Sequence, residues 1–427
     1  MKVEYLATFF FAFSLLHSFL VSYFAKMAHR FSKGSASEAF LHLLSEVEVV
    51  FGFWAFLFLI CWALLEGVAP VIQYQQSLKL TEPLFIFCIM IIASTRPIIT
   101  AARRIILSVS LVLAKLLSID RLTMQLFTLM SLGPLLGSLI TEPAAITISA
   151  LLLYRMIDET KIESELLYGL IALLFVNVSV GGALTHFSAP PILIVAQTWS
   201  WSLADVFSNL GLAAIFSVVI NSLIFTCLFR KKIKTSLKLI EADVYRMPGW
   251  VIYSHLTFLA AVVATAHYSQ VFFGLFLIFI GLVTVTKLYQ DELKFKEAFL
   301  VAFFLSGLIV FGTLQRWWIE PLLLAMNNTA LFFGAAALTS VTDNAALTYL
   351  GSQVSQLSDF SKWALVAGAL SGGGLTILAN APNPAGYSIL SSKFPDSTLN
   401  AYLLFKAALL PTAVVLICFY IKLFILG

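Results

Sequence analysis

The amino-acid sequence predicts an all-α, polytopic membrane protein, and three observations support this fold class. Of the 427 residues, 60% are hydrophobic and only 11% are charged, which lies well outside the range of soluble domains. The mean hydropathy is strongly positive. Apolar runs long enough to cross a bilayer recur along the chain, beginning with Tyr5 to Ala25. They predict about 10–12 spans joined by short loops, with no room for a soluble domain.

The first apolar run is predicted to be a retained span. It is longer than the core of a signal peptide, and both Lys2 and Glu4 precede it instead of a clearly basic segment. The cysteines stand singly inside apolar runs, so they form neither a metal-ligand spacing nor a disulfide framework, and no cofactor is expected. They are Cys61, Cys88, Cys227 and Cys418. The net charge of +4 mostly reflects loop topology and indicates no nucleic-acid partner.

Two basic segments predict the orientation of the chain. The denser one runs from Arg230 to Arg246, near the middle of the sequence, and the positive-inside rule places it in the cytoplasm. A smaller group, Lys26, Arg30 and Lys33, follows the first apolar run and should lie on the same side. The chain must then cross the membrane an even number of times between the two segments.

The central basic segment divides the chain into two halves that we interpret as copies of one unit. The sequence LITEPAAIT, which ends at Thr147, aligns with SVTDNAALT, which ends at Thr348. A second pair follows in the same order: GGALTHFSAPP from Gly181 and GGGLTILANAP from Gly372. The predicted organisation is an N-terminal span and basic loop (1–42), repeat 1 (43–229), a basic cytoplasmic linker (230–246) and repeat 2 (247–427).

All four stretches have the composition of a helix that is interrupted inside the membrane. Backbone rich in Gly and Pro survives at membrane depth only where it is buried in protein or lines a cavity. Thr141 is a good N-cap before Pro143, and Thr342 or Asp343 could begin a helix in the same way. Broken helices at matching positions of two halves indicate a transporter binding site near the bilayer midplane.

Asp343 is the main candidate for an ion-binding group. An ionised carboxylate at the bilayer centre costs about 2.5–3.5 kcal/mol on insertion scales, so it is paired, protonated or bound to a cation. Because oxygen ligands suit a hard cation, we expect Asp343, Asn344 and Thr376 to hold Na+. The same stretches contribute the other candidate substrate- or ion-binding residues: Thr342, Thr348, Gly372, Gly373, Asn380, Asn383, Thr141, Glu142, Thr147, Gly181, Gly182, Thr185 and Ser188. His186 is a candidate proton relay.

Purely structural interpretations compete with these hypotheses. Asp343 and Asn344 could form a solvated turn between two ordinary helices. Glu142 could begin a helix at the membrane surface, and His186 could be a hydrogen-bonded interior histidine. The run Arg155–Glu165 mixes charges densely and is expected to be a solvated loop. Since no Walker loop, HExxH motif or Ser-His-Asp arrangement emerges, we expect neither an enzyme nor nucleotide-driven transport.

The segment LTSVTDNAALT resembles the acid-amide motif of the ion-transporter superfamily, which includes bacterial sodium/proton antiporters, arsenite permeases and sodium/dicarboxylate carriers. GGGLTILANAPN is similar to the Gly-rich stretch of these families, and the overall pattern most resembles a group of sodium/proton antiporters. The resemblance covers residues 82–427. It implies two inverted repeats, each with a re-entrant hairpin and a broken helix, and often a homodimer.

Carried over to this chain, the resemblance places Asp343 and Asn344 at the acid-amide pair. It places Gly372, Gly373, Thr376 and Asn383 in the Gly-rich segment. The first half departs from the pattern, because Glu142 and Pro143 stand where an Asp-Asn pair would be expected. A symmetrical two-site cation arrangement is therefore not implied.

The sequence thus predicts a secondary transporter that exchanges a monovalent cation, Na+ in the leading hypothesis, for H+ by rigid-body movement of a substrate-carrying unit. Its surroundings would be the lipid bilayer of a bacterial inner (plasma) membrane, and its partner a small inorganic cation. Two alternatives stay open. One is a sodium- or proton-coupled carrier of an organic or metalloid anion on the same scaffold. The other is a membrane receptor or binding protein that transports nothing.

Overall fold

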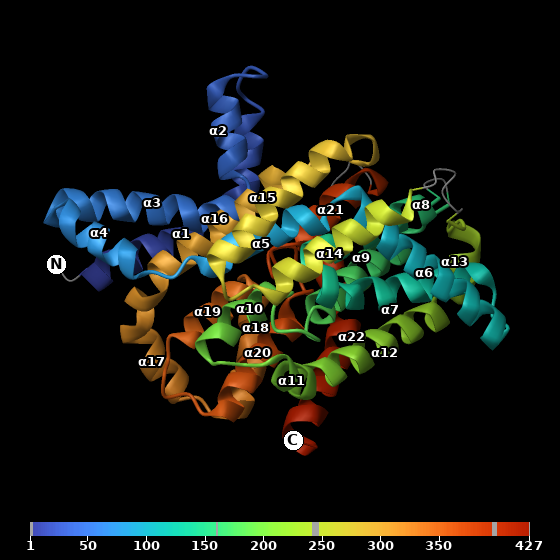
Figure 1. Ribbon diagram of the computed structural model, residues 1–427. Coiled ribbons are helices and arrows are strands. Elements are labelled where there is room, and N and C mark those ends of the chain that lie inside the picture. The colour runs from blue at the N-terminus through green and yellow to red at the C-terminus, as the bar shows by residue number, and fades with distance from the viewer. Residues whose placement is uncertain (1–2, 159–160, 241–246, 395–398, 427) are drawn as a thin grey trace. The chain divides into compact units, whose positions relative to one another are not determined.

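The computed structural model describes residues 3–158, 161–240, 247–394 and 399–426, and helices make up most of this chain (Figure 1). Its one β contact in the described residues is an isolated antiparallel bridge between Ile157 and Leu237. The predicted all-α class is therefore confirmed. Two parts of the predicted charged segments, 159–160 and 241–246, lie outside the described residues.

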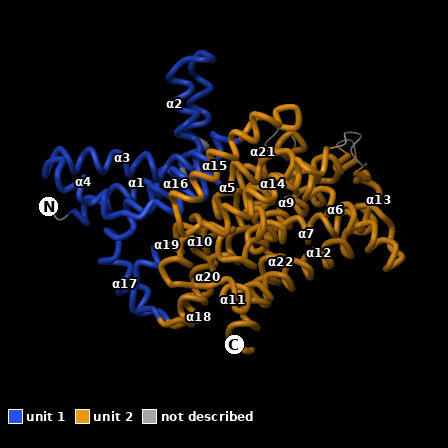
Figure 2. Tube along the Cα trace, in the orientation of Figure 1, with its two compact units in different colours: residues 1–88, 294–326, 349–357 blue, residues 89–293, 327–348, 358–427 orange. Residues whose placement is uncertain are grey.

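By packing, the chain divides into two compact units (Figure 2). Unit 1 comprises residues 1–88, 294–326 and 349–357, and unit 2 comprises residues 89–293, 327–348 and 358–427. Each unit therefore draws on both predicted repeats. The repeat boundaries remain a prediction, because compactness does not test sequence duplication.

Unit 1 is organised around helix α3, which packs against α1 and α16. Gly307 allows α16 to approach α3 closely, because a Cβ at this position would lie 2.4 Å from the backbone nitrogen of Gly52. Small residues at such crossings are typical of helix pairs in membranes. The helices of unit 1 are α1 (Val3–Ala28), α2 (Ala36–Leu44), α3 (Val47–Glu66), α4 (Val68–Ser77), most of α5 (Thr81–Ala93), α16 (Phe295–Gly312) and α17 (Arg316–Leu324).

Unit 2 contains all four predicted helix interruptions. Helices α7 (Arg121–Ile140) and α8 (Glu142–Met156) are separated only by Thr141 and pack against each other, so the chain reverses direction there. Residues 182–189 separate α9 (Ser164–Gly181) from α10 (Pro190–Thr198). The second half follows the same order: α18 (Asn328–Thr339), a break at 340–343, α19 (Asn344–Ser352), α20 (Asp359–Gly372), a break at 373–382, and α21 (Asn383–Leu390).

Helix packing within unit 2 also repeats between the halves. Helix α7 packs on α9 as α18 packs on α20, and α10 packs on α20 as α21 packs on α9. Helices α9 and α20 pack directly on each other. Exchanging the halves maps these contacts onto one another, whereas the α7–α8 and α8–α21 contacts have no equally extensive counterpart in the described second half, so the internal repeat stays a prediction. Its inverted orientation stays a prediction.

The remaining helices of unit 2 flank these interrupted ones. Helix α12 packs against α7, α9 and α22. These flanking helices are α6 (Arg96–Leu117), α11 (Leu203–Val206), α12 (Leu212–Leu228), α13 (Arg230–Ser236), α14 (Gly249–Ala264), α15 (Ser269–Val285) and α22 (Ala401–Tyr420).

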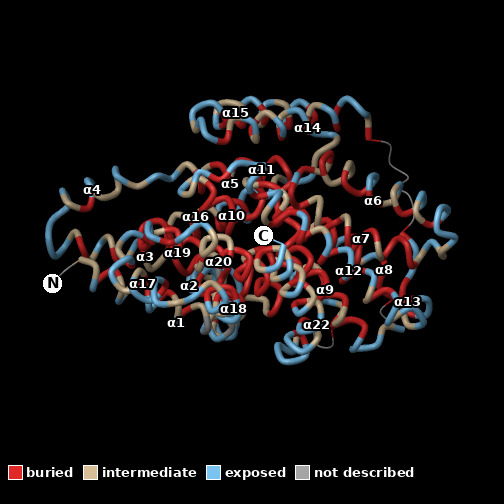
Figure 3. Tube along the Cα trace, turned by 90° about the horizontal axis from the view of Figure 1, so that it is seen from below, coloured by how far each residue is buried: buried red, intermediate tan, exposed pale blue. Residues whose placement is uncertain are grey.

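Burial separates the central helices of unit 2 from its outer ones. All of α9 from Leu166 to Gly181 except Gly169 is buried, as is α20 from Ala364 to Gly372. In Figure 3, where buried positions are red, the outer helix α15 carries many exposed and intermediate positions. Helices that are apolar on all sides belong in the interior of a large helical protein. The helix breaks that follow α9 and α20 therefore lie in an interior setting.

The count of membrane spans depends on how the shorter helices are treated. Among the described residues, 7 helices are long and apolar enough to cross a membrane, or 8 if the bent pair α4 and α5 forms one span. The predicted total of about 10–12 is reached only if shorter apolar helices also cross. Those helices are Val3–Ser18, Gly249–Ala264, Ser269–Val285 and Asn328–Thr339.

Candidate ion-binding site

Glu142 is the first residue of α8 and is fully buried. Its Oε2 accepts a hydrogen bond of 3.2 Å from Asn380 Nδ2, whereas its Oε1 has no hydrogen-bond partner. Thr141 before it has a φ of 78°, which is rare for a β-branched residue. Gly182 leaves room for the carboxylate, because a Cβ there would lie 2.8 Å from Oε1. The first-half motif therefore places a partly unsatisfied acid in the interior of unit 2.

Asp343 precedes α19 and is 8% exposed. Its Oδ1 accepts hydrogen bonds from the backbone nitrogens of Ala345, at 2.8 Å, and Ala346, at 3.1 Å. These donors belong to the first helical turn and have no partner inside the helix. Asp343 is thus the capping residue, one of the two candidates that the sequence offered, and the helix dipole favours its negative charge.

Asn344 next to it carries the largest unmet hydrogen-bonding capacity of the site. Its backbone N–H donates to the carbonyl oxygen of Ala379 at 3.1 Å, which joins the two breaks of the second half. Its side chain is fully buried, and neither Nδ2 nor Oδ1 has a hydrogen-bond partner. An unsatisfied amide in an interior is costly unless a ligand meets it. The oxygen of Asn344 can therefore serve a bound ion.

The two acids belong to one polar centre. Asn380 lies in the break before α21 and donates to Glu142, while its Oδ1 has no partner. Its neighbour Ala379 accepts the backbone hydrogen bond of Asn344, which follows Asp343. The carboxyl groups of Glu142 and Asp343 are close enough to interact electrostatically. Within the described residues, no lysine or arginine pairs with either acid. Both halves of the chain therefore contribute a carboxylate without a cationic partner.

Other predicted residues hold the second-half break in place. Asn383 Nδ2 donates to the carbonyl oxygens of Gly373, at 2.8 Å, and Thr376, at 2.9 Å. The Thr376 hydroxyl donates to the carbonyl oxygen of Ser340 at 2.9 Å. These bonds satisfy carbonyls that have left the helical pattern, as backbone at membrane depth requires. The Oδ1 of Asn383, like that of Asn380, is buried and has no hydrogen-bond partner.

Gly373 permits the close approach of α9 to this break. A Cβ on Gly373 would lie 2.1 Å from Ser179 Oγ and 2.9 Å from Asn344 Nδ2. Gly372 is similarly confined, since a Cβ there would lie 2.3 Å from the carbonyl oxygen of Ala336. The paired glycines therefore provide room for neighbouring atoms, whereas the oxygens of the site come from other residues.

Hydroxyl groups hold the first-half break in place by hydrogen bonds to its backbone. Ser138 on α7 donates to the carbonyl oxygen of Gly181 at 2.7 Å and accepts from the backbone nitrogen of Leu184 at 3.0 Å. Thr185 donates to the carbonyl oxygen of Ser138, and Ser188 to that of Gly182. The hydroxyls of Thr147 and Thr348 bond carbonyls within their own helices. The Thr342 hydroxyl, in the break after α18, donates to the carbonyl oxygen of Leu338 at 2.9 Å, and Thr342 is partly buried.

His186 lies in the first-half break and is half-buried, and its Nδ1 has no hydrogen-bond partner. Its ring stacks on that of His267, with ring centroids 6.4 Å apart and planes inclined by 9°. His267 precedes α15 and is exposed. Among the residues that the structure describes, no hydrogen bond joins these two rings, so a proton-relay role for His186 stays a prediction.

Sequence reasoning missed several residues that shape the site. Ser138 bonds from α7 to the first-half break, Ser179 donates from α9 to the carbonyl oxygen of Leu370 on α20, and Asn177 joins α9 to α7 and α12. Asn177 gave a weak signal, as a single amide inside the apolar run that leads to Gly181. The serines gave none, because a serine in an apolar helix usually bonds its own preceding turn.

The donor set suits a hard cation. Its free atoms are the Glu142 Oε1 and the amide oxygens of Asn344, Asn380 and Asn383. Carboxylate and amide oxygens are the ligands that such ions prefer. In the described part of the chain, no group of three or more His, Cys, Asp or Glu side chains could hold a metal ion.

The fold and the site together define a class. Interrupted helices from two halves meet around buried acids in a multi-pass membrane protein, which is the architecture of a secondary transporter. A family model described as "Putative Na+/H+ antiporter" matches residues 2–422. The chain therefore belongs to this family of ion-transporting membrane proteins, which are transporters rather than enzymes, and the resemblance predicted from its motifs is confirmed. No curated protein matches the chain.

Proposed function

We propose that the protein exchanges Na+ for H+ across the membrane, with Asp343 and Glu142 as the groups that bind either ion. The observation that carries this proposal is the burial of two carboxylates that interact with each other and pair with no lysine or arginine of the described chain. Ionised carboxylates in such a setting need a counter-charge, and either a proton or a cation supplies it. Mutually exclusive binding of the two is the basis of antiport.

The neutral oxygens around the acids favour a monovalent metal ion as the alternative to the proton. Asn344 and Asn380 each have a buried side-chain oxygen without a partner, and Asn380 already contacts Glu142. A cation bound among these oxygens would replace the missing hydrogen bonds. The hydroxyl of Thr376, predicted as a ligand, donates a hydrogen bond to the carbonyl oxygen of Ser340, so its own oxygen keeps lone pairs for an ion.

The anion-carrier alternative has less support from this geometry. Helices α8 and α19 do begin at the site, and helix N-termini attract anions. However, each of these N-termini already carries an acid of the protein itself. A substrate carboxylate would therefore meet Glu142 and Asp343, and it becomes favourable only if cations bind first.

The test is proton movement in liposomes that contain the purified protein and a preset pH gradient. Addition of Na+ should dissipate the gradient in the wild type and fail to do so in Asp343→Asn. The matched control is Asp359→Asn, which removes an acid whose side chain is 88% exposed at the start of α20. Folded wild-type protein that moves no protons with Na+, Li+ or K+ across several pH values would refute the proposal.

Two further features are proposed with this function. The protein would form a homodimer, and it would reside in a bacterial inner membrane. The mass of the detergent-solubilised protein, measured by light scattering with the detergent contribution subtracted, checks the first. A mass of one chain, 47.0 kDa, at all concentrations used would refute the dimer.

A further inference from the structure

A cavity of about 550 Å³ lies between α9, α12 and α22 of unit 2, and none of its lining residues belongs to the proposed ion site. Its wall is mainly apolar and includes Leu173, Phe225, Leu228 and Leu410. Leu228 is 66% exposed and Leu410 is 54% exposed, so the cavity opens at the surface of the unit. Since α12 and α22 both lie in candidate membrane spans, we expect this opening to face hydrocarbon.

One end of the cavity is polar. Glu165 lies in the first turn of α9, and Lys406 lies in the second turn of α22. The two helix starts are adjacent, because the Tyr168 hydroxyl accepts a 2.8 Å hydrogen bond from the backbone nitrogen of Asn400. Phe229, at the end of α12, also lines the cavity and leads directly into the basic helix α13. The positive-inside rule places this end at the cytoplasmic face.

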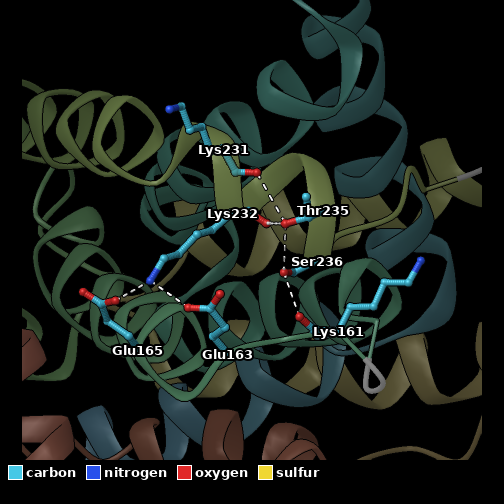
Figure 4. A network of polar contacts seen from close by, with 7 residues as sticks. All are labelled: Lys161, Glu163, Glu165, Lys231, Lys232, Thr235 and Ser236. Atoms are coloured by element: carbon cyan, nitrogen blue, oxygen red, sulfur yellow. Dashed lines mark hydrogen bonds and ion pairs between the residues drawn. The ribbon is translucent and has the colours of Figure 1, made fainter.

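At this end of the cavity one lysine is paired with two acids, whereas another lysine of the described chain lines the cavity without forming an ion pair. Lys232 on α13 lies between the carboxylates of Glu163, at 2.8 Å, and Glu165, and both acids turn toward its Nζ (Figure 4). Lys231 Nζ points away from this cluster (Figure 4). In the described chain, Lys406 forms no ion pair although it lines the cavity. An anionic group at the mouth would therefore meet a free ammonium group.

We propose that this cavity binds a phospholipid of the cytoplasmic leaflet, with one acyl chain between α9, α12 and α22 and the phosphate at Lys406. The volume lies within the usual range of ligand pockets, about 300–1,000 Å³. An apolar wall with one cation at its cytoplasmic end matches the two parts of a phospholipid and matches a soluble anion poorly. Lipid phosphate is attracted to lysines at the membrane surface.

The inner end of the cavity connects this lipid to the packing of unit 2. Asn221 and Pro411 line it, and Asn221 Nδ2 donates to the Pro411 carbonyl oxygen and to Asn177 Oδ1, both at 3.1 Å. Asn177 in turn donates to the carbonyl oxygen of Met130 on α7. A bound acyl chain therefore stabilises the helix junction that supports the α7–α8 hairpin.

The experiment uses the full chain in liposomes that contain a phospholipid with a photoactivatable group on its acyl chain. Cross-linked peptides are mapped by mass spectrometry and should come from α9, α12 and α22 at the cavity. Ala407→Trp fills the cavity and should abolish these cross-links, whereas Ala401→Trp, on the same helix outside the cavity, should not. Lys406→Gln should lower the yield about fivefold, with Lys422→Gln as its control.

Cross-links that persist in Ala407→Trp, or that spread evenly over exposed apolar helices, would overturn the proposal. A diacylglycerol probe without phosphate that labels equally well would overturn the assignment of the phosphate to Lys406. Should Ala407→Trp fail to fold, the exposed Lys406 still provides a test, because an unchanged cross-link yield in Lys406→Gln relative to Lys422→Gln would overturn the proposal. Because binding is measured directly, these results are independent of whether the protein exchanges Na+ for H+.

Discussion

Glu142 shows at the scale of single residues how a position that is ambiguous in sequence becomes defined by its contacts. The sequence allowed a surface helix start as well as a binding group, since an acid before proline suits both. In the structure its side chain is fully buried and Asn380, 238 positions away, donates to it. No local pattern could have predicted that contact, because it depends on how α8 and α21 pack.

Glu142→Gln should keep the side-chain volume and a polar contact with Asn380 while removing one charge from the site. We expect the Na+ concentration for half-maximal proton movement to rise about tenfold, because hydrogen bonds and contacts to charged groups contribute roughly 1.5–3 kcal/mol. The measurement is the liposome assay described above. An unchanged Na+ dependence would show that Asp343 alone binds the ion.

Gly373→Ala tests the crowding around Asn344. The added Cβ would clash with Ser179 Oγ, so we expect a loss of about 1–3 kcal/mol in stability, seen as a lower Tm in detergent. Gly281→Ala on α15 is the control, because nothing lies within 4 Å of a Cβ there. Ser179→Ala in the Gly373→Ala background should recover part of the loss. Additive losses in the double variant would exclude this clash as the cause.

The proline inside α7 gives the next prediction, at the scale of helices. Pro134 has no N–H, so the carbonyl oxygen of Met130 lacks its helical donor, and Asn177 Nδ2 supplies one at 2.8 Å. Asn177→Ala should therefore cost about 1–3 kcal/mol of stability. The cost should be smaller in the Pro134→Ala background, where the helix provides the donor. Equal costs in the two backgrounds, measured by thermal unfolding, would contradict this account.

The basic segment after α12 was predicted as a cytoplasmic linker and the run Arg155–Glu165 as a solvated loop, yet the structure brings them together. Lys232 pairs with Glu163 and Glu165, and Lys238 pairs with Asp158 at 3.1 Å. The charges of each segment were evident from sequence. Their pairing was not, because about 70 intervening residues must fold before the opposite charges meet.

Hydrogen bonds to Glu163 and Glu165 raise the pKa of Lys232 above its ordinary value of 10.5. A group with a raised folded-state pKa stabilises fully below its unfolded pKa and loses that effect as pH rises through the folded value. We therefore expect amide protection of residues 230–238, corrected for intrinsic exchange, to stay constant from about pH 6 to 9. Lys232→Gln should reduce this protection, with Lys231→Gln as control. Equal protection in both variants would show that the ion pairs do not hold α13.

At the scale of the whole molecule, composition was enough to predict a membrane protein, and the Gly and Pro content of four stretches was enough to predict the four helix breaks. The division into two units was not accessible, because unit 1 joins residues 1–88 to 294–326 and 349–357 through packing alone. Helix α19 even contributes to both units. Such long-range grouping depends on surface complementarity between helices, which the hydrophobic pattern of each helix does not encode.

The orientation of the two halves is open to a direct test. Arg121 begins α7 beside Asp120, which pairs with Lys234 of the basic segment at 3.4 Å, so Arg121 should lie on the cytoplasmic side. Thr329, near the start of α18, holds the corresponding place in the second half. If the repeats are inverted, these two positions lie on opposite sides of the membrane.

Single cysteines at these positions, in a chain whose four natural cysteines are replaced, can be labelled with a membrane-impermeant maleimide in intact cells. We expect Thr329→Cys to react and Arg121→Cys to react only after the membrane is permeabilised, because an inverted repeat exposes equivalent helix starts to opposite compartments. Lys33→Cys should behave like Arg121→Cys if an even number of spans separates the basic segments. Labelling of Arg121→Cys and Thr329→Cys from the same side would show parallel copies, and α8 and α19 would then enter the ion site from one direction only.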